Sequence, residues 1–518
     1  MNRDKHIQEL TSIKEFDICI IGGGATGLGI AIDAASRGCK TILLEKCDFV
    51  KGTSSRSTKL VHGGVRYLQQ GNIKLVMEAL KERGLLKKNA PHLVKNQSFV
   101  IPNYKWWENP FYGIGLKVYD WMAGSLGLGP SQFLSTEETI KHIPNIDSNG
   151  LTGGVLYHDG QFDDARLGIH LAMTASAHGA VVLNYMGVEE LLKSKGVVCG
   201  VKVKDSLDGN EYEVKSKVVI NATGIFSDSI AKMDNPAAEP LITHSQGIHL
   251  VFDKKFLPSE TAIMIPKTDD GRVLFAVPWH NKIIVGTTDT PISKVSEEPV
   301  AQQEEIEFVL THIARYLAMD PTMADVRSVF AGLRPLVKSN SKVTSAISRD
   351  HHIQISDSEL ISITGGKWTT YRKMAEDVMD IAICKLGLNT KECVTQNIHI
   401  HGYKENTDFS APLYYYGTDE ENIKELVKNN SALVQLIHPS LPYIKAEISW
   451  AVQNEMCMTL EDALSRRTRA LLLDSKAAIE AAPLVAELMA VEMQKDSIWI
   501  KNQLAHFKLI ANNYLPTY

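Results

Sequence analysis

The chain has few of the features that mark a secreted, membrane-spanning or nucleic-acid-binding protein. Its seven cysteines are scattered along 518 residues without a Cys-x-x-Cys pair or a metal-ligand spacing, as is typical of reduced cytoplasmic thiols. No uninterrupted apolar run reaches the length of about 18 residues that a transmembrane helix needs. The formal net charge of −5 argues against a nucleic-acid partner, which usually leaves a strongly basic footprint.

The N-terminal residues lack the apolar centre of a signal peptide, and the chain contains no repeat or low-complexity segment. Its composition is that of an ordinary globular protein, with 44% hydrophobic and 22% charged residues. The length corresponds to about two to four domains. We therefore expect a cytoplasmic protein of several domains, for which peripheral attachment to a membrane stays open.

The strongest motif is the stretch 16–45, FDICIIGGGATGLGIAIDAASRGCKTILLE. A β-type run leads into Gly22-x-Gly24-x-x-Gly27, a helix of small residues follows, and a second β-run ends at Glu45. In such a βαβ unit Gly22 permits a tight turn, Gly24 lets a pyrophosphate approach, and Gly27 allows close helix packing. The helix N-terminus faces the phosphates, and Glu45 can accept hydrogen bonds from an adenosine ribose. The unit predicts a dinucleotide site without choosing between NAD and FAD.

A loop rich in hydroxyl groups follows at residues 51–70. Hydroxyls and loop amides are natural donors to pyrophosphate oxygens. His62-Gly63-Gly64 would then let the backbone pass close to a flat group. A polar surface loop is the plainer alternative, but the position directly after a dinucleotide unit favours a binding role. The hydroxyl residues are Thr53, Ser54, Ser55, Ser57 and Thr58.

This loop resembles the signature of the FAD-dependent glycerol-3-phosphate dehydrogenases. The string TSSRSTKLVHGGVRYL carries the likeness, which covers about residues 15–385. The segment DALSRRTRALLLD at 462–474 extends it toward the C-terminus. Further matches follow in the family's order: DDARL at 163–167, NATG at 221–224, GTTD at 286–289, GLRPL at 332–336, SRDH at 348–351 and GGKWTTYRKMAE at 365–376.

The resemblance implies an α/β fold with a Rossmann-like FAD-binding domain, an antiparallel-sheet substrate domain and a helical C-terminal domain. We place the FAD-dependent oxidoreductase region at residues 1–395 and the helical domain at 396–518. Within the first region, the FAD-binding segments are expected at about 15–75, 150–240 and 355–385. The substrate segments are expected at about 76–149 and 241–354.

An aromatic-rich segment at residues 104–128 contains three of the seven tryptophans. Ile114, Val118, Trp121 and Met122 would share one face of a helix. Such a face suits either a membrane interface or an ordinary protein core. The family delivers electrons to a membrane quinone, which adds weight to the membrane interpretation.

Short β-runs between residues 245 and 289 predict an antiparallel sheet that covers the flavin. His249 lies inside one of them, in GIHLVF. A histidine with such apolar neighbours is ordinarily a structural core residue. The resemblance instead places it on the sheet face toward the flavin, as the candidate catalytic base.

Several cationic residues accompany the later motifs. Arg334 lies between Gly332 and a proline, and Lys367 follows a pair of glycines at a predicted helix start. A single arginine is ordinarily part of a surface salt bridge. Several cations within flavin-fold motifs favour an anion pocket, and arginine binds phosphate in a bidentate manner.

The candidate site combines the resemblance with this chemistry. His249, His62, Arg334 and Lys367 are the catalytic candidates, with His62 the second choice as base. Substrate binding is assigned to Arg66, Tyr67, Arg334, Arg349 and Lys367. No metal site is expected. Cofactor contacts are assigned to Gly22, Gly24, Thr26, Gly27, Glu45, Thr53, Ser54, Ser55, Ser57, Lys59, Leu60, Gly63, Gly64, Ala222, Thr223, Gly224, Gly366, Lys367, Trp368 and Thr369.

The family implies oxidation of sn-glycerol 3-phosphate to dihydroxyacetone phosphate, with a hydride passing from C2 to N5 of FAD. The electrons would reach a respiratory quinone at the inner face of the cell membrane. Related oxidases use oxygen and carry an insertion in the substrate region. The segment 332–366 is too compact for that insertion, which favours a dehydrogenase.

The sequence is also compatible with two other functions. A non-catalytic flavin-binding redox sensor would have no need for Arg66, Arg334, Arg349 and Lys367 together. An enzyme acting on an amine or a 2-hydroxy acid would also use arginine, for a carboxylate. His62 or a cysteine could tether FAD covalently, although no tether is expected, and a homodimer is possible.

The region from about residue 408 onward is mostly helical by pattern, at 423–427, 443–455, 459–473 and 476–504. Arg466, Arg467 and Arg469 form a basic cluster in it. Such a cluster is usually a solvated face with carboxylate partners, and contacts to another chain are the sharper alternative.

Overall fold

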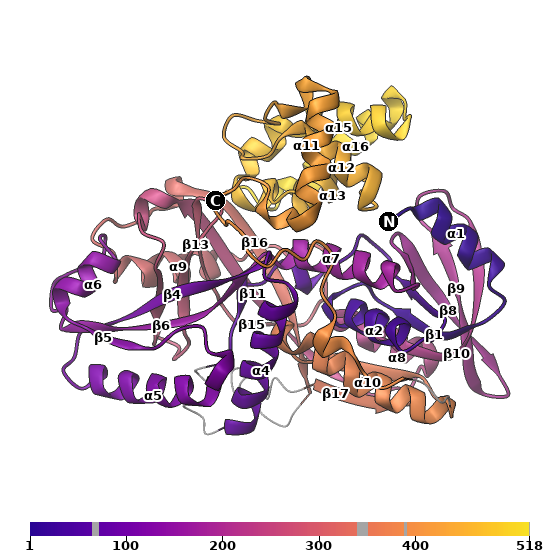
Figure 1. The fold of residues 1–518 in the computed structure, drawn as a ribbon, viewed down its shortest axis with the longest axis horizontal. Helices are drawn as coiled ribbons and strands as arrows, with labels where there is room; N and C mark the ends of the chain where they lie inside the picture. Colours follow the sequence, from indigo (N-terminus) through magenta and orange to yellow (C-terminus); the bar gives the residue numbers. More distant parts are fainter. Residues whose placement is uncertain (65–71, 339–350, 388–390, 517–518) are drawn as a thin grey trace.

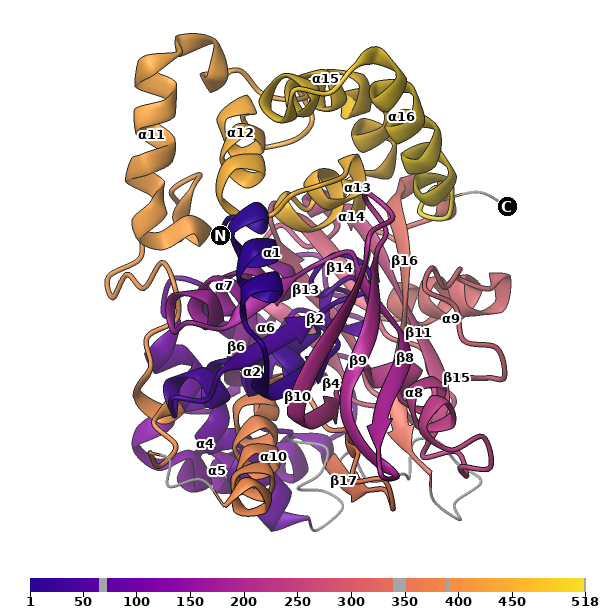
Figure 2. The same cartoon turned by 90° about the vertical axis from the view of Figure 1, so that its right-hand side faces the viewer.

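The computed structural model describes residues 1–64, 72–338, 351–387 and 391–516. Two sheets lie side by side, and a group of C-terminal helices caps them at one end (Figures 1 and 2). The predicted α/β architecture with an antiparallel second sheet and a helical C-terminal region is confirmed.

The first sheet is built around the predicted βαβ unit. Strand β1 (Phe16–Ile21) lies parallel to both β2 (Thr41–Leu44) and β10 (Glu211–Asn221). The other strands on this path are β7 (Val181–Leu183), β18 (Ile361–Gly365) and β17 (His351–Ile355). β1 and β2 are almost continuously apolar and buried, as expected for parallel strands that are covered on both faces.

Helices and a β-ribbon cover the two faces of this sheet. The core on one side contains residues of α2 (Ala25–Ser36), α7 (Asp164–Ala177) and α10 (Tyr371–Leu386). The core on the other side is completed by α1 (Arg3–Ser12), α8 (Ser227–Asp234), β8 (Met186–Ser194) and β9 (Val197–Asp205).

The second sheet contains the antiparallel strands predicted between residues 245 and 289, and strands from elsewhere in the chain extend it. Its long central pair is β11 (Ile242–Asp253) with β16 (Val326–Val337), in a register that places Gly247 opposite Gly332. The other strands are β15 (Thr290–Ile292), β14 (Lys282–Gly286), β13 (Leu274–Trp279), β12 (Ala262–Ile265), β4 (Val94–Asn103), β6 (Gly153–Phe162), β5 (Gln132–Leu134) and β3 (Leu60–Val61).

Helices also pack on this second sheet. α9 (Gln303–Ala314) contributes Ile306, Val309 and Ile313 to one core, and α6 (Thr136–His142) lies beside the same strands. On the other side, α5 (Glu108–Ala123) packs through Leu116, and α4 (Ile73–Asn89) packs against α5.

Two long helices predicted near the C-terminus are interrupted. The predicted helix 476–504 is two helices, α15 (Ser475–Met493) and α16 (Ser497–Asn512). Gln494 ends the first in the left-handed conformation, and the side chain of Asp496 caps the second. The predicted helix 459–473 is broken by a π-helical turn, Ala463–Arg467. The helices of the cap are α11 (Glu420–Asn429), α12 (Lys445–Asn454), α13 (Leu460–Asp462), α14 (Ala470–Leu473), α15 (Ser475–Met493) and α16 (Ser497–Asn512).

The cap is continuous with the core of the first sheet. Leu28 of α2, Ile169 of α7, Leu464 of the π-helical turn and Val485 of α15 belong to one cluster of buried apolar residues. The cap helices are thus packed onto the dinucleotide-binding half of the molecule, which places their side chains within reach of its loops.

The aromatic segment forms α5, and much of its apolar surface is not in the core. Trp106 and Trp121 are each 83% exposed, and Ile114 is 64% exposed. The interpretation as an ordinary core helix is therefore wrong for this face. Among the described residues, no helix combines the length and the apolar character needed to cross a membrane.

Candidate active site

A cavity of about 740 Å³ lies between the two sheets. One wall comes from the turns that follow β1, β2, β10 and β18, at the carboxyl ends of the parallel strands. Ligands of open α/β sheets bind at this edge. The opposite wall comes from β11, β13 and β16 of the second sheet, so the cavity is enclosed by two layers of different origin.

The glycine turn has the close contacts that its sequence predicts. Gly22 has a φ of +109°, and a side chain there would collide with the carbonyl oxygen of Ala222. A side chain at Gly27 would in turn collide with the carbonyl of Gly22. Helix α2 begins after Gly24, which has no side chain to cap the first-turn amides, and Ser54 Oγ accepts from Ala25 N at 3.1 Å. This donor-lined turn fits a pyrophosphate.

Glu45 lines the same cavity from the end of β2. Its carboxylate accepts from Gly23 N at 2.6 Å and from Cys47 N at 2.9 Å. Burial raises the pKa of Glu45 above its ordinary value. Each carboxylate oxygen can accept more than one hydrogen bond, so the group keeps capacity for the hydroxyls of a ribose.

Most of the predicted cofactor residues line the cavity, and a few lie behind the wall. Lys59 donates from Nζ to Ser55 O at 2.8 Å and to Asp164 Oδ2 at 2.7 Å. Burial lowers the pKa of Lys59 to about 8. Lys59 and Ser55 thus support the loop from behind, and Gly27 packs under the turn. The predicted cofactor residues that line the cavity are Gly22, Gly24, Thr26, Glu45, Thr53, Ser54, Ser57, Leu60, Ala222, Thr223, Gly224, Gly366, Lys367, Trp368 and Thr369.

His249 lines the cavity from β11, and its ring is held in place. Its Nε2 lies 2.9 Å from Thr58 Oγ1, and its ring stacks on Phe330 with centroids 4.8 Å apart. Gly286 leaves room for it, since a side chain there would overlap the imidazole. Burial, with the charges of Lys59 and Arg334, holds the pKa of His249 well below its ordinary value. The imidazole is therefore neutral at pH 7.

Arg334 reaches the cavity from β16 with an oriented guanidinium group. Its Nη2 donates to Thr287 Oγ1 at 2.9 Å, and its Nη1 donates to Thr288 O at 3.0 Å and approaches Asp289 Oδ1 at 3.4 Å. A guanidinium fixed in this way presents a preformed positive fork to an anion. The pairing of β16 with β11, which places Arg334 opposite Ser245, explains why its side chain points into the cavity.

The turn after β18 brings the remaining candidates of the first sheet into the same cavity. Lys367 and His62 both line it. Trp368 Nε1 donates to Ser54 O at 2.8 Å, and Thr369 Oγ1 donates to His62 O at 3.4 Å. These bonds join the turn after β18 to the hydroxyl-rich loop, although the two are about 300 residues apart in the chain.

The remaining candidates are three substrate residues and two glycines. Arg66, Tyr67 and Arg349 lie outside the described residues. Gly63 donates from its amide to Tyr119 Oη at 2.8 Å and, like Gly64, is not part of the cavity lining. Thr58 and Thr287, the partners of His249 and Arg334, belong to quoted motifs but were not among the assigned site residues. Arg56 and Phe275 also line the cavity without having been predicted.

Comparisons with known proteins agree with this geometry. The family described as FAD dependent oxidoreductase matches residues 17–372, and the C-terminal domain of alpha-glycerophosphate oxidase matches residues 360–498. The chain is 41% identical to mitochondrial glycerol-3-phosphate dehydrogenase of Mus musculus, over 95% of this chain and 72% of that protein. The human protein of the same name is also 41% identical, over 97% and 74%.

Solved structures give the same result. Glycerol-3-phosphate dehydrogenase from Bacillus halodurans, complexed with FAD, superposes with a TM-score of 0.81 at 30% identity, covering 99% of this chain and 98% of that one. L-alpha-glycerophosphate oxidase from Mycoplasma pneumoniae, with FAD bound, has a TM-score of 0.58 at 17% identity over 73% and 97%, and shares the fold. The chain therefore belongs to the FAD-dependent oxidoreductases, in the family of FAD-dependent glycerol-3-phosphate dehydrogenases.

Proposed function

We propose that this chain oxidises sn-glycerol 3-phosphate to dihydroxyacetone phosphate and passes the electrons to a membrane quinone. The observation that carries the proposal is that His249 and Arg334, from one sheet, share a cavity with the glycine turn of the other. FAD, when bound there, supplies the acceptor for the hydride that leaves C2 of the substrate. The protein must then supply a base, an anion clamp and a dry, oriented site.

His249 has the properties of the base. It is neutral at pH 7, and its bond with Thr58 fixes the orientation of the ring. A buried imidazole can remove the proton of the C2 hydroxyl as the hydride leaves, and the phosphate of the substrate would favour the imidazolium that forms. His62, in the same lining, is the alternative position for this role.

Arg334 and Lys367 supply positive charge on opposite walls of the cavity. The contacts of Arg334 with Thr287 and Thr288 orient its donors before the substrate arrives, so little ordering remains to be done on binding. Arg66 and Arg349 complete the predicted clamp. A dianionic phosphate is the anion that needs this many cations, whereas a carboxylate needs fewer.

An anaerobic titration of the flavin-loaded protein with glycerol 3-phosphate tests the proposal. We expect stoichiometric bleaching of the visible flavin absorption, and none with glycerol or lactate. A protein that stays yellow with glycerol 3-phosphate would overturn the substrate assignment.

The electron acceptor is tested next. After reduction of the flavin, a soluble quinone and dissolved oxygen are compared as acceptors. Reoxidation by oxygen at the rate of turnover would make the protein an oxidase instead.

The finer proposal is that the protein lies peripherally on the inner face of the cell membrane through α5. The exposed face that we call the aromatic face consists of apolar side chains on and beside this helix. Helix α5 lies at the end of the molecule opposite the helical cap (Figures 1 and 2). A lipid-soluble acceptor requires the protein to approach a bilayer, and tryptophan is favoured at its interface. The exposed residues are Trp106, Trp107, Phe111, Ile114, Val118 and Trp121.

Co-sedimentation with vesicles of phosphatidylcholine and phosphatidylglycerol tests this surface. Trp121→Ser together with Trp106→Ser should reduce the bound fraction severalfold while activity with a soluble acceptor stays unchanged. Leu509→Ser is the matched control, because Leu509 is a large, 70% exposed apolar residue on the cap helix α16. Equal loss of binding in both variants would exclude the aromatic face as the contact.

A further inference from the structure

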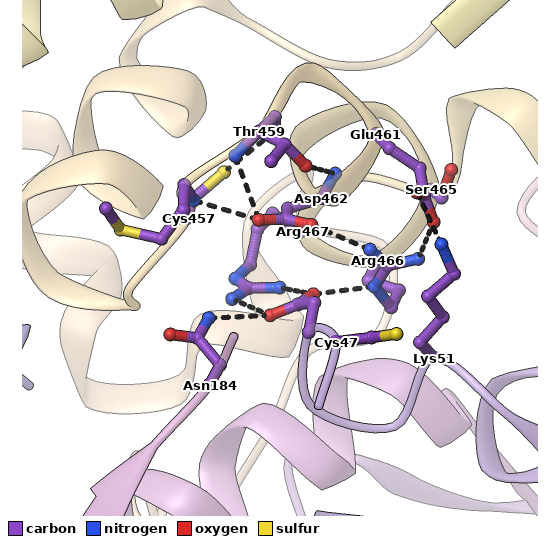
Figure 3. Close-up of polar contacts among 12 residues, drawn as sticks. Cys47, Lys51, Asn184, Cys457, Thr459, Glu461, Asp462, Ser465, Arg466 and Arg467 are labelled. Carbon is purple, nitrogen blue, oxygen red and sulfur yellow. Dashed lines mark hydrogen bonds and ion pairs between the residues drawn. The ribbon is translucent and has the colours of Figure 1, made fainter. Parts of the chain in front are cut away.

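The basic cluster of the C-terminal region is buried, contrary to the expectation of a solvated face or a contact with another chain. Arg466, Arg467 and Arg469 are 2%, 1% and 1% exposed. They lie in and just after the π-helical turn, and we call residues 463–469 the arginine turn. Figure 3 shows Arg466 and Arg467 extending from this turn toward the loop that carries Cys47 and Lys51.

The loop that they approach, residues 45–59, is here called the cavity loop. It supplies a large share of the cavity wall between the end of β2 and the start of β3. Helix α2 and the loop meet through Ala25 N and Ser54 Oγ, at the glycine turn. The loop residues that line the cavity are Glu45, Lys46, Cys47, Val50, Lys51, Gly52, Thr53, Ser54, Arg56, Ser57 and Thr58.

The first half of the loop is held through Asp48. Arg467 binds its carboxylate with two nitrogens, Nη1 to Oδ2 at 2.6 Å and Nη2 to Oδ1 at 2.9 Å. Arg466 Nε donates to the same Oδ2 at 2.6 Å. Burial alone would raise the pKa of Asp48, but the two guanidiniums outweigh it and hold that pKa below its ordinary value. Asp48 is not part of the cavity lining, so this contact holds the loop from behind.

A second contact holds the first half of the cavity loop through Lys51. Arg466 Nη1 donates to Glu461 Oε1 at 2.7 Å, and Lys51 Nζ donates to Glu461 Oε2 at 2.7 Å. Arg466 Nη2 also donates to Asp462 Oδ1 at 2.7 Å. Glu461 therefore links a cavity-lining lysine to the arginine turn, with one carboxylate shared between two cations.

The second half of the loop is held by Arg469. Its Nη2 donates to Ser55 O at 2.8 Å and to Asp164 Oδ1 at 3.0 Å. The other oxygen of Asp164 accepts from Ser57 N at 3.0 Å, from Ser57 Oγ at 2.7 Å and from Lys59 Nζ at 2.7 Å. In the sequence analysis Asp164 belongs only to the motif DDARL, without a role of its own. It is also the centre to which the end of the cavity loop is tied.

The contacts of Asp48 and Glu461 form one connected ionic network of largely buried groups, beside the separate group around Asp164. The carboxylates of Asp48, Glu461 and Asp462 face the cations of Lys51, Arg466 and Arg467. Lys51 also pairs with Glu298 at 3.4 Å, and Arg467 Nε lies 3.8 Å from Glu455 Oε2. A buried charge that loses its partner cannot be solvated by water, so the network favours one arrangement of the loop strongly. The arrangement depends on the cap as much as on the dinucleotide-binding half.

We propose that the arginine turn positions the cavity loop for FAD, and that the helical cap thereby determines how tightly the cofactor is held. Arg466, Arg467 and Arg469 are positioning residues that act through Asp48, Glu461 and Asp164. Without them the loop amides and hydroxyls would have to be ordered when FAD binds, which costs affinity. The cap thus contributes to cofactor retention in addition to packing.

A pair of matched arginine variants separates this role from general stability. Arg467→Lys removes the bidentate contact with Asp48. Arg37→Lys removes another buried bidentate contact, from Arg37 to Asp33 at 2.9 and 2.7 Å, which lies at the C-terminal end of α2 and involves neither the cavity loop nor the cap. Apoprotein of each full-length variant is titrated with FAD at a temperature where both are folded, and the Tm of each apoprotein is recorded.

We expect Arg467→Lys to raise the Kd for FAD at least tenfold, and Arg37→Lys to change it less than twofold although its Tm also falls. Hydrogen exchange of the amides of residues 47–57 in the apoprotein should accelerate in Arg467→Lys alone. Equal Kd values for the two variants, with unchanged exchange in the loop, would overturn the proposal.

Glu461→Gln covers the case in which Arg467→Lys does not fold. Glu461 is buried between Lys51 and Arg466 and is outside the cavity lining, so it can affect FAD only through these two residues. The proposal expects a Kd raised threefold or more, with the loop amides less protected. A folded Glu461→Gln protein that binds FAD as the parent does would contradict it.

Discussion

A methyl group on Gly247 would overlap the guanidinium of Arg334, which extends across β11 from the neighbouring strand β16. The same methyl would also crowd Thr287 Oγ1, which accepts a hydrogen bond from Arg334. The absence of a side chain at residue 247 is thus what allows the guanidinium to occupy this position over the sheet.

Gly247→Ala should therefore impair substrate binding without unfolding the protein. The overlap is with the far end of a flexible side chain, so the guanidinium moves while the strands stay paired. Displacing one charged hydrogen bond costs about 1.5–3 kcal/mol, which corresponds to a rise in KM for glycerol 3-phosphate of at least tenfold. Steady-state kinetics with a soluble acceptor measure it.

Gly115→Ala is the control for this prediction, because a side chain at Gly115 would meet open space. Its KM should equal that of the parent. If Gly247→Ala also keeps the parental KM, Arg334 does not bind the substrate from the position described.

Truncation of Arg334 itself should have a larger effect. Arg334→Ala removes a preorganised cation from the cavity, and such a loss typically costs about 2–4 kcal/mol of transition-state binding. The ratio kcat/KM should fall at least tenfold, while FAD remains bound because the glycine turn and cavity loop are unaffected. Arg334→Lys should recover only part of the loss, since lysine lacks the bidentate fork. Unchanged turnover in Arg334→Ala would remove this residue from the site.

His249→Asn tests the assignment of the base. General-base catalysis is worth roughly 10²- to 10⁴-fold, so kcat should fall by that range with FAD binding retained. Rapid reduction of the flavin under single-turnover conditions isolates the chemical step. If the reduction rate falls less than threefold in His249→Asn and steeply in His62→Asn, the proton acceptor is His62.

The residues that sequence could predict belong to local motifs. The glycine turn, the hydroxyl-rich loop and Arg334 each have neighbours in the chain that indicate their backbone geometry, and all three contribute to the cavity. The family resemblance added the prediction that His249 faces the flavin, whereas its apolar neighbours in the chain indicate an ordinary core histidine. Fold class and cofactor followed from the same motifs, and the comparisons confirm both.

The relation between the arginine turn and the cavity loop could not be predicted in this way. Arg466 and Asp48 are separated by 418 residues, and neither lies in a pattern that names its partner. A basic cluster on a predicted helix favours a solvent-facing interpretation, because helical periodicity does not show the π-helical turn that directs it inward. Whether a charged side chain is buried with a partner depends on the tertiary structure, which local sequence patterns do not show.

The last prediction concerns Glu447, a buried carboxyl group in α12 of the cap. Its Oε1 accepts from Tyr415 Oη and lies 3.4 Å from Tyr416 Oη, and its Oε2 accepts from Ile444 N at 2.7 Å. Burial raises the pKa of Glu447 from 4.5 to about 7. The folded protein thus binds this proton more tightly than the unfolded chain does.

The sign of the pH dependence follows from linkage. The contribution of Glu447 to stability is fully present below about pH 4.5 and is lost as the pH rises through about 7, because the folded state must then ionise a buried group. The loss amounts to roughly 3 kcal/mol over this window. Glu447→Gln does not titrate. Between pH 5 and pH 8 the free energy of unfolding of this variant should therefore increase relative to that of the parent by roughly this amount.

Denaturant unfolding of both apoproteins at several pH values measures this difference. Subtracting the two curves removes the contributions of the other titrating groups, among them the buried histidines His92 and His170, whose pKa values are lowered. The lost hydrogen bond of the variant adds a constant offset that does not depend on pH. A difference that stays flat from pH 5 to pH 8 would mean that Glu447 titrates at its ordinary pKa, and that its hydrogen bonds with the tyrosines hold the ionised form in the core.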